Sequence, residues 1–351
     1  MSAASKAFTT PNPATRPQIQ KFSGTAKRFV LILCLVQAAA AFAQLPLPAP
    51  QRYEASLDAM GSAFSVAVYG EDRDALASAV DAALEEARRL DHKLSNYRAD
   101  SEWSQVNRFA ADREVAVSPE LFRLLEACVR YSAATEGSFD ISVGPLMKVW
   151  GFYKGSGKLA SKAEVGEALG RVGYKGIVLD AEKRTVRFAK PGMEIDPGGV
   201  GKGYAVDRMV AVLKEYGIRQ AFVTAGGSSM YALGAPPGEM GWKVIIRHPK
   251  DANRTVAEVV LKDESMSTSG NYEKFFRADG KIYSHIMDPR TGFPSMGMYS
   301  VSVITPQCLD SEIWAKPFYI LGRQWAAEHK PQGFRVFLCE DKGDAVCAWL
   351  Q

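Results

Sequence analysis

The sequence predicts an α+β fold with mixed, largely antiparallel sheets and flanking helices. Two observations favour this class. Short β-rich segments occur in runs, and helical patterns lie irregularly between them instead of alternating with strands as in a doubly wound sheet. The 351 residues are 47% hydrophobic and 23% charged, which suits a globular chain with one large core or two moderate ones.

The first part of the folded region is expected to hold β structure and two helices. Apolar and polar side chains alternate within residues 56–69, which indicates a strand. Residues 72–91 have the apolar periodicity of a helix, and 118–135 predict a second helix capped by its first residue, a serine. Residues 94–107 carry side chains that compete with regular structure and are expected to form a loop. Residues 139–153 are rich in turn formers and are expected to pass close to a site.

The remainder is expected to be mostly β structure with interspersed helices. A short helix is predicted at 163–169, and a longer one at 204–216 that ends at Gly217. Residues 311–322 are expected to be helical in spite of Pro317. The expected strands are 177–180, 186–188, 221–224, 242–247, 255–261, 264–268 and 298–304, with 335–339 and 345–350 forming a closing hairpin.

Residues 1–43 have the order of a secretory signal peptide. Lys27 and Arg28 precede an apolar run over 29–36, and small residues at 41–43 form a cleavage site. The run is too short for a comfortable membrane span. Residues 44–52 are Pro-rich and predict a linker to a folded domain over 53–351. The chain is therefore expected to be exported to the periplasm or cell envelope, with membrane association, if any, only through an uncleaved N-terminal segment that anchors it to the inner membrane.

The positive charge of the chain belongs to this segment. Removing its five basic residues from the 43 of the whole chain leaves 38 basic against 39 acidic residues, a net charge of about −1. The folded domain therefore gives no reason to expect a nucleic-acid partner.

Four cysteines follow the predicted signal peptide: Cys128, Cys308, Cys339 and Cys347. They lack the CxxC spacing of zinc sites, so a structural zinc is not expected. Cys339 and Cys347 could pair across the C-terminal hairpin, and buried free thiols are the equal alternative.

Residues 194–207 form the segment most typical of a ligand site. Four glycines within 198–203 surround Lys202 directly before a helical pattern. A P-loop is excluded because Asp196 and Gly203 stand where it needs Gly and Ser or Thr, and the spacing of a dinucleotide fingerprint also fails. Free N–H groups at a helix start and an ammonium group still favour an anion, with a tight structural turn as the alternative.

A second cluster includes His285, Asp288 and Arg290. The histidine and the carboxylate could perform acid–base chemistry, and the guanidinium suits a phosphate or carboxylate. A single histidine near a turn is by itself more typical of a structural residue, so the cluster gains weight only from the glycine-rich segment and from Ser-Gly-Asn-Tyr at 269–272.

Taken together, these motifs resemble the ApbE family in order and spacing. The matching segments are DPGGVGKGYAVD at 196–207, AGG at 225–227, SGNYE at 269–273, HIMDPRTG at 285–292, MGS at 60–62, LSNY at 94–97, SE at 101–102, VGPL at 143–146 and WGF at 150–152. The match covers essentially the whole chain after residue 52. It implies an ApbE-type, T-fold-like α+β domain.

The resemblance also implies a function. Members of this family are exported FAD:protein FMN transferases, which bind FAD, move its FMN half onto a threonine hydroxyl of an acceptor flavoprotein, release AMP and use magnesium. Cleaving a diphosphate needs cationic and N–H stabilisation, which the glycine-rich segment could supply. His285 and Asp288 would lie beside the reacting phosphate, with His285 as the base for the threonine. The residues implied to contact or frame FAD are Met60, Tyr97, Ser101, Glu102, Lys202, Asp207, Gly226, Gly227, Tyr272 and Arg290.

The sequence departs from the family pattern around the metal. Ser228 follows AGG where the family usually has Asp, and Glu312 and Lys316 occupy the places of an Asp and a Thr that bind the metal, beside Ala225. Glutamate can still ligate magnesium, whereas an ammonium cannot ligate a cation.

Three accounts of this departure follow. Lys316 could pair with Glu312 and replace magnesium at the diphosphate, which would make it a catalytic residue; the site could have lost turnover, leaving an FAD-binding or carrier protein; or Lys316 could face solvent, with Asp310 as the ligand. The leading hypothesis is the flavin transferase. A non-catalytic FAD-binding protein and an FAD hydrolase are the alternatives.

Overall fold

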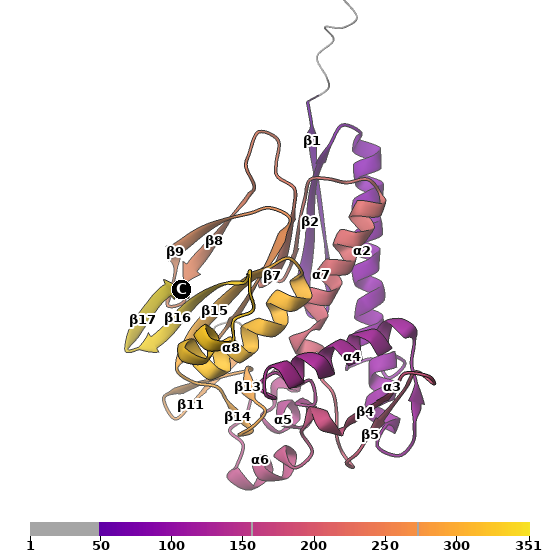
Figure 1. Ribbon diagram of the computed structural model, residues 1–351, viewed down its shortest axis with the longest axis vertical. Helices are drawn as coiled ribbons and strands as arrows, with labels where there is room; N and C mark the ends of the chain where they lie inside the picture. The colour runs from indigo at the N-terminus through magenta and orange to yellow at the C-terminus, as the bar shows by residue number, and fades with distance from the viewer. Residues whose placement is uncertain (1–48, 156, 272–273) are drawn as a thin grey trace, which may run out of the picture. The chain divides into compact units, whose positions relative to one another are not determined.

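The computed structural model describes residues 49–155, 157–271 and 274–351. The predicted signal peptide, most of the predicted linker and Tyr272 lie outside these residues. The domain is built on an eight-stranded sheet of order β1-β2-β6-β7-β10-β15-β16-β17, antiparallel throughout (Figure 1). The strands are β1 Gln51–Ala59, β2 Ser62–Gly70, β6 Ala221–Ala225, β7 Ser229–Leu233, β10 Glu264–Gly270, β15 Met298–Thr305, β16 Arg335–Lys342 and β17 Asp344–Trp349.

Three helices cover one face of this sheet: α2 (Arg73–Leu94), α7 (Gly201–Glu215) and α8 (Cys308–His329). The apolar faces of α2 and α7 pack on β1, β2, β6 and β7, where Phe64 and Val223 are fully buried. A second apolar cluster joins α8 to β15 and β16 around Phe318 and Val301. Burial of this apolar surface holds the three helices on the sheet.

The opposite face of the sheet is covered by the hairpin of β8 (Trp242–His248) and β9 (Asp251–Leu261). Val244 and Leu261 from the hairpin pack against Met266 of β10 and Phe337 of β16. Successive side chains in a strand point to opposite faces, so β10 and β15 serve both layers.

A smaller lobe lies beside the helical face, in the lower part of Figure 1. Its core is formed by α3 (Glu102–Phe109), α4 (Pro119–Ala134) and the sheet β3-β5-β4, around Trp103 and Leu125. Its other elements are β3 Val115–Ala116, β4 Ile177–Asp180, β5 Thr185–Phe188, α5 Gly144–Val149, α6 Lys162–Leu169 and the hairpins β11 Phe275–Ala278 with β12 Lys281–Ser284 and β13 Met287–Asp288 with β14 Phe293–Pro294.

The α+β class with largely antiparallel sheets is confirmed, and most expected elements are present. Ser118 caps α4 by accepting from the backbone N–H of Leu121, and Pro119 occupies the first helical position. The closing hairpin is β16–β17. The expected helix over 311–322 is present but extends from Cys308 to His329 across a kink at Gly322, where φ is 80°.

Three expectations were wrong in detail. The loop expected over 94–107 contains the start of α3, because Ser101 caps a helix that buries Trp103 and Val106. The predicted linker 44–52 includes the start of β1 at Gln51, and the β-rich segment that follows is a hairpin turning at Met60 and Gly61, both with positive φ. The turn-rich segment expected over 139–153 contains a short helix, α5, that was not expected.

Cys339 and Cys347 stand opposite each other in β16 and β17 and form a disulfide, while Cys128 and Cys308 are buried free thiols.

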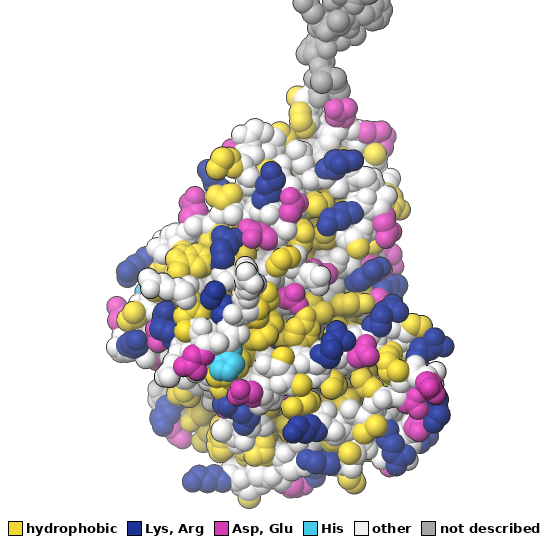
Figure 2. Space-filling model, viewed as in Figure 1, with side chains coloured by type: hydrophobic (Ala, Val, Ile, Leu, Met, Phe, Trp, Pro, Cys, Tyr) yellow, Lys and Arg dark blue, Asp and Glu magenta, His cyan; other side chains and the backbone are white. Residues whose placement is uncertain are grey.

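Figure 2 shows one face of the protein, on which basic and acidic side chains are interspersed. Within the residues the structure describes, no helix combines the length and apolar character needed to span a membrane.

Candidate functional site

A cavity of about 610 Å³ opens between the helical face of the main sheet and the smaller lobe. Its volume lies within the range of small-molecule binding sites. The walls come from segments far apart in sequence: the Met60 turn, 94–97, 138–153, the glycine-rich segment, β10, 285–289 and α8. Met60 is held at the wall by its backbone N–H, which donates to Asp91 Oδ1 at 2.8 Å.

The glycine-rich segment forms a short 3₁₀ turn over Pro197–Gly199 and then begins α7 at Gly201. Gly203 is required by packing, because a Cβ there would lie 2.6 Å from the carbonyl oxygen of Cys308 and 2.8 Å from Glu312 Oε2. The absence of a side chain thus lets α7 and α8 approach closely. Gly198, Gly199 and Lys202 line the cavity, as the prediction of an anion site requires.

Asp196, at the start of this segment, is the centre of a buried polar network that the sequence did not indicate. Its Oδ2 accepts from Asn96 Nδ2 at 2.8 Å and from the Tyr153 hydroxyl at 2.7 Å, and its Oδ1 accepts from the Gly198 N–H at 2.8 Å. Burial raises the pKa of the Asp196 carboxyl although these donors oppose the shift. The network fixes the glycine turn against residues 94–97.

His285 lines the cavity, and its Nδ1 lies 3.0 Å from the backbone oxygen of Lys274. A carbonyl oxygen only accepts, so in the neutral ring Nδ1 carries the proton and Nε2 keeps its lone pair. Protein atoms surround the ring, although part of it stays open to the cavity. This desolvation, reinforced by the charges of Lys202, Lys274 and Lys316, lowers the pKa of His285 from 6.5 to about 4. The imidazole is therefore neutral at neutral pH, with Nε2 available as a base.

Three lysines line the cavity: Lys202 from α7, Lys274 before β11 and Lys316 from α8. Lys202 contacts Ser228, the residue that departs from the family pattern. Sequence reasoning identified Lys202 and Lys316 and missed Lys274. No local signal could have indicated it, because its relevance depends on the hairpin that places it beside His285.

Lys316 and Glu312 face the same cavity, one helical turn apart. The Lys316 ammonium donates to the Glu312 backbone oxygen at 2.7 Å and lies 3.8 Å from Glu312 Oε1. Glu312 is buried, and its Oε2 accepts from the Gly203 N–H at 2.5 Å. Asp310, the alternative ligand, is not among the residues that line the cavity and instead accepts from the Tyr131 hydroxyl.

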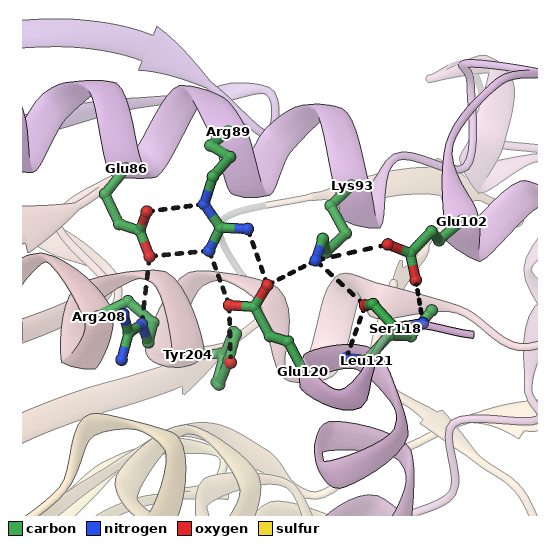
Figure 3. Close-up of polar contacts among 9 residues, drawn as sticks. All are labelled: Glu86, Arg89, Lys93, Glu102, Ser118, Glu120, Leu121, Tyr204 and Arg208. Atoms are coloured by element: carbon green, nitrogen blue, oxygen red, sulfur yellow. Dashed lines mark hydrogen bonds and ion pairs between the residues drawn. The ribbon is translucent and has the colours of Figure 1, made fainter. Parts of the chain in front are cut away.

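Several predicted site residues hold the scaffold and are not among the residues that line the cavity. Ser101 caps α3, and Glu102 accepts from the Ser118 N–H at 2.9 Å while pairing with Lys93 at 3.4 Å (Figure 3). Figure 3 shows this pair as the end of a polar chain that ties α2 to α4 and α7 through Glu120.

Asp207 likewise acts within the scaffold. It accepts from the backbone N–H groups of Cys308 and Leu309, both at 2.8 Å, and so caps α8 from α7. Burial raises the pKa of the Asp207 carboxyl to about 6.

The remaining predicted residues divide in the same way. Met60, Tyr97 and Gly226 line the cavity with Lys202, His285, Glu312 and Lys316. Asp288 and Arg290 pair with each other at 2.8 Å behind the wall, and Ala225 and Gly227 are also not among the lining residues. Ala225 is buried in β6, where its carbonyl oxygen accepts from the Ser228 N–H at 3.3 Å.

Comparison with known proteins identifies the family of this chain. The model of the ApbE family matches residues 60–338. An FAD:protein FMN transferase of Klebsiella pneumoniae is 32% identical over 274 residues, covering 77% of this chain and 83% of the relative. The enzyme of the same name from Salmonella typhimurium is 31% identical and covers 83% and 85%.

Solved structures show the same fold. The ApbE protein of Thermotoga maritima superposes with a TM-score of 0.78 at 28% identity, covering 85% of this chain and 96% of that one. The flavin transferase ApbE of Vibrio cholerae gives a TM-score of 0.74 at 25% identity, covering 86% and 96%. The fold, the extent of the match and the cavity assembled by the shared motifs lead to one conclusion: the chain belongs to the ApbE family.

Proposed function

We propose that this chain is an FAD:protein FMN transferase that moves FMN from FAD onto a threonine hydroxyl of an acceptor flavoprotein and releases AMP. The observation that carries the proposal is His285, a neutral imidazole whose Nε2 is unprotonated in a cavity that three lysines also line. The two relatives described above are named for this activity, and their matches to this chain extend over more than four fifths of each relative's length.

In the proposed reaction the threonine Oγ attacks the phosphorus of the FMN half. The bond from that phosphorus to the oxygen bridging the two phosphates breaks, and AMP leaves with that oxygen. Nε2 of His285 takes the hydroxyl proton, and lysine ammonium groups offset the charge that develops on the phosphate oxygens. Electrons and atoms balance without an oxidant or reductant.

The residues that line the cavity suit the chemistry of FAD. Met60 and Tyr97 offer apolar and aromatic surface at the wall, and the Tyr97 side chain is 76% exposed and sits edge-on to Tyr153 with ring centroids 6.1 Å apart. An exposed aromatic ring at the edge of a cavity suits stacking with a flat ring system. Glycine-rich backbone and Lys202 suit the diphosphate.

The residues around Glu312 do not suit magnesium. Oε2 already accepts from Gly203, Oε1 faces the Lys316 ammonium, and the Ala225 carbonyl is used within the scaffold. In the described part of the chain, no group of three or more His, Cys, Asp or Glu is arranged to hold a metal ion. Magnesium requires octahedral oxygen ligands and is repelled by a neighbouring ammonium. The proposed transfer therefore does not depend on a magnesium ion bound beside Glu312.

The proposal is tested by incubating the protein with FAD and an acceptor domain, and by measuring the mass of the acceptor together with released AMP. His285→Asn keeps a donor to the Lys274 carbonyl but removes the base, and a loss of about 10²- to 10⁴-fold in transfer rate is expected. His329→Asn, a histidine at the end of α8 that is not among the cavity-lining residues, is the matched control.

Other outcomes identify the alternatives. AMP release without a mass change of the acceptor would replace the transferase by an FAD hydrolase. FAD that stays intact with both acceptor and magnesium present would replace it by a non-catalytic FAD-binding protein.

We also propose that the protein is exported. The disulfide between Cys339 and Cys347 supports an oxidising compartment, in agreement with the signal-like residues 1–43. Fusing residues 1–52 to a reporter enzyme that is active only after disulfide formation tests this. An inactive reporter in the cytoplasmic fraction would contradict export.

A further inference from the structure

We propose that Lys202, Lys274 and Lys316 form one anion-binding cluster that holds the diphosphate of the nucleotide directly, so that FAD binding needs no divalent cation. The proposal deepens the proposed function and rests on it for the identity of the ligand. The three lysines come from separate elements, and all line the same cavity as His285.

The first support is their convergence on one point. The charge of each of the three ammonium groups opposes protonation of the same imidazole, His285. The charge of Lys274 also favours ionisation of Asp196 on the glycine-rich segment, and its backbone oxygen lies 3.0 Å from His285 Nδ1. Like charges gathered around one point of a cavity create a field that attracts an anion.

The second support is that the carboxylates of the cavity are engaged by the protein. Asp91 accepts from the Met60 N–H, and Asp140 accepts from the N–H groups of Ser142 and Tyr174. Asp196 accepts from three donors of the turn network described above, and Glu312 accepts from Gly203. At least one oxygen of each carboxylate is thus engaged by a backbone or side-chain donor, whereas a metal ion bridging protein and diphosphate would need these oxygens as ligands.

The third support is the place of Lys316. Gly199 of the glycine-rich segment has no side chain, and a Cβ there would lie 3.7 Å from Lys316 Cε, so the lysine stem lies directly against the turn. Its stem therefore lies at the end of the cavity that Gly199 and Lys202 also line. A diphosphate bound there would lie beside the start of α7 and would be contacted by the ammonium groups.

Binding measurements test the cluster separately from turnover. FAD, ADP and riboflavin are each titrated into the protein by calorimetry, in EDTA and then in magnesium. We expect FAD and ADP to bind in EDTA, with magnesium changing either Kd less than about twofold. Lys274→Met should weaken FAD and ADP about 10- to 100-fold, the range of a lost charge-assisted contact, and should leave riboflavin, which has no phosphate, within about twofold.

Lys281→Met is the matched control, since Lys281 is an exposed lysine of the same β11–β12 hairpin that is not among the cavity-lining residues. Lys274→Arg keeps the charge and should bind FAD within a few-fold of the unaltered protein, which excludes misfolding as the cause. Lys316→Thr should weaken FAD in EDTA and recover affinity when magnesium is added.

FAD binding that appears only with magnesium, or a Lys274→Met variant that titrates like Lys281→Met, would overturn the cluster. Binding in EDTA without transfer to the acceptor would reject the proposed function and leave the cluster intact. FAD binding that strictly requires magnesium, together with transfer in its presence, would reject the cluster and leave the function intact.

Discussion

Replacing His285 by asparagine should make the protein less sensitive to acid. In the folded protein the pKa of His285 is about 4, against 6.5 in the unfolded chain. The unfolded chain therefore binds the proton more tightly, so the stabilising difference is fully present above pH 6.5 and is lost as the pH falls toward 4. The whole difference amounts to about 3.4 kcal/mol, and about 2 kcal/mol of it is lost between pH 7.5 and pH 5.

The assay is urea unfolding at pH 7.5 and pH 5, followed by tryptophan fluorescence, with the linear dependence of free energy on urea giving the stability at each pH. The stability of His285→Asn relative to the unaltered protein should rise by about 2 kcal/mol on going to pH 5. His329→Asn serves again as the control, since His329 stacks on Trp325 at the end of α8.

An unchanged stability difference between the two pH values would refute the reasoning, because it would mean that His285 titrates alike in the folded and unfolded chains. The same result would remove the argument that burial and the lysine charges lower the pKa of His285 in the folded protein. A relative loss of stability at pH 5 would go further and indicate that the folded protein holds His285 as a cation.

Three further predictions concern the scaffold. Asp207→Asn should gain about 1.4 kcal/mol of stability relative to the unaltered protein between pH 5 and pH 7.5, because the folded pKa of Asp207, about 6, lies above its ordinary value of 3.8. If the free energies of unfolding of the two proteins, measured in urea, changed equally with pH, this prediction would be contradicted. Tyr153→Phe should cost about 1–3 kcal/mol by removing a donor from buried Asp196, and it should weaken FAD binding by loosening the glycine turn; calorimetry and urea unfolding check both. Replacing both Cys339 and Cys347 by serine should lower the free energy of unfolding by about 2.5 kcal/mol, the value for a loop closed over a sequence separation of 8. An unchanged midpoint of urea unfolding would mean that the disulfide does not constrain the unfolded chain in this way.

Local patterns were enough to predict most of the helices and strands. The helix over 118–135 was correct because a serine cap, a proline at the first helical position and an apolar stripe all favour the same register. The missed helix α3 has the same kind of cap at Ser101, but its eight residues give too short a pattern to outweigh the turn formers before it.

The site was harder to predict, because its contacts join residues far apart in the chain. Asn96 and Asp196 are 100 residues apart and Tyr153 lies between them, so no spacing in the sequence shows that they meet. Motif resemblance found the segments that line the cavity but did not separate residues that face the ligand from residues that hold the segments in place. Ser101, Glu102 and Asp207 share motifs with cavity residues and serve as helix caps or ion-pair partners.

The lysines and the histidine are best understood as one system. A base with a pKa near 4 takes a proton from a hydroxyl less readily than one with a pKa near the working pH. Part of the lowering comes from the ammonium groups of Lys202, Lys274 and Lys316, and a bound diphosphate would offset those charges. In the proposed mechanism, FAD therefore raises the proton affinity of His285 on binding, so that the imidazole becomes a stronger base only when the phosphorus to be attacked is in place. A magnesium ion at the same position would oppose that rise, which gives the cluster a chemical role beyond replacing a cation.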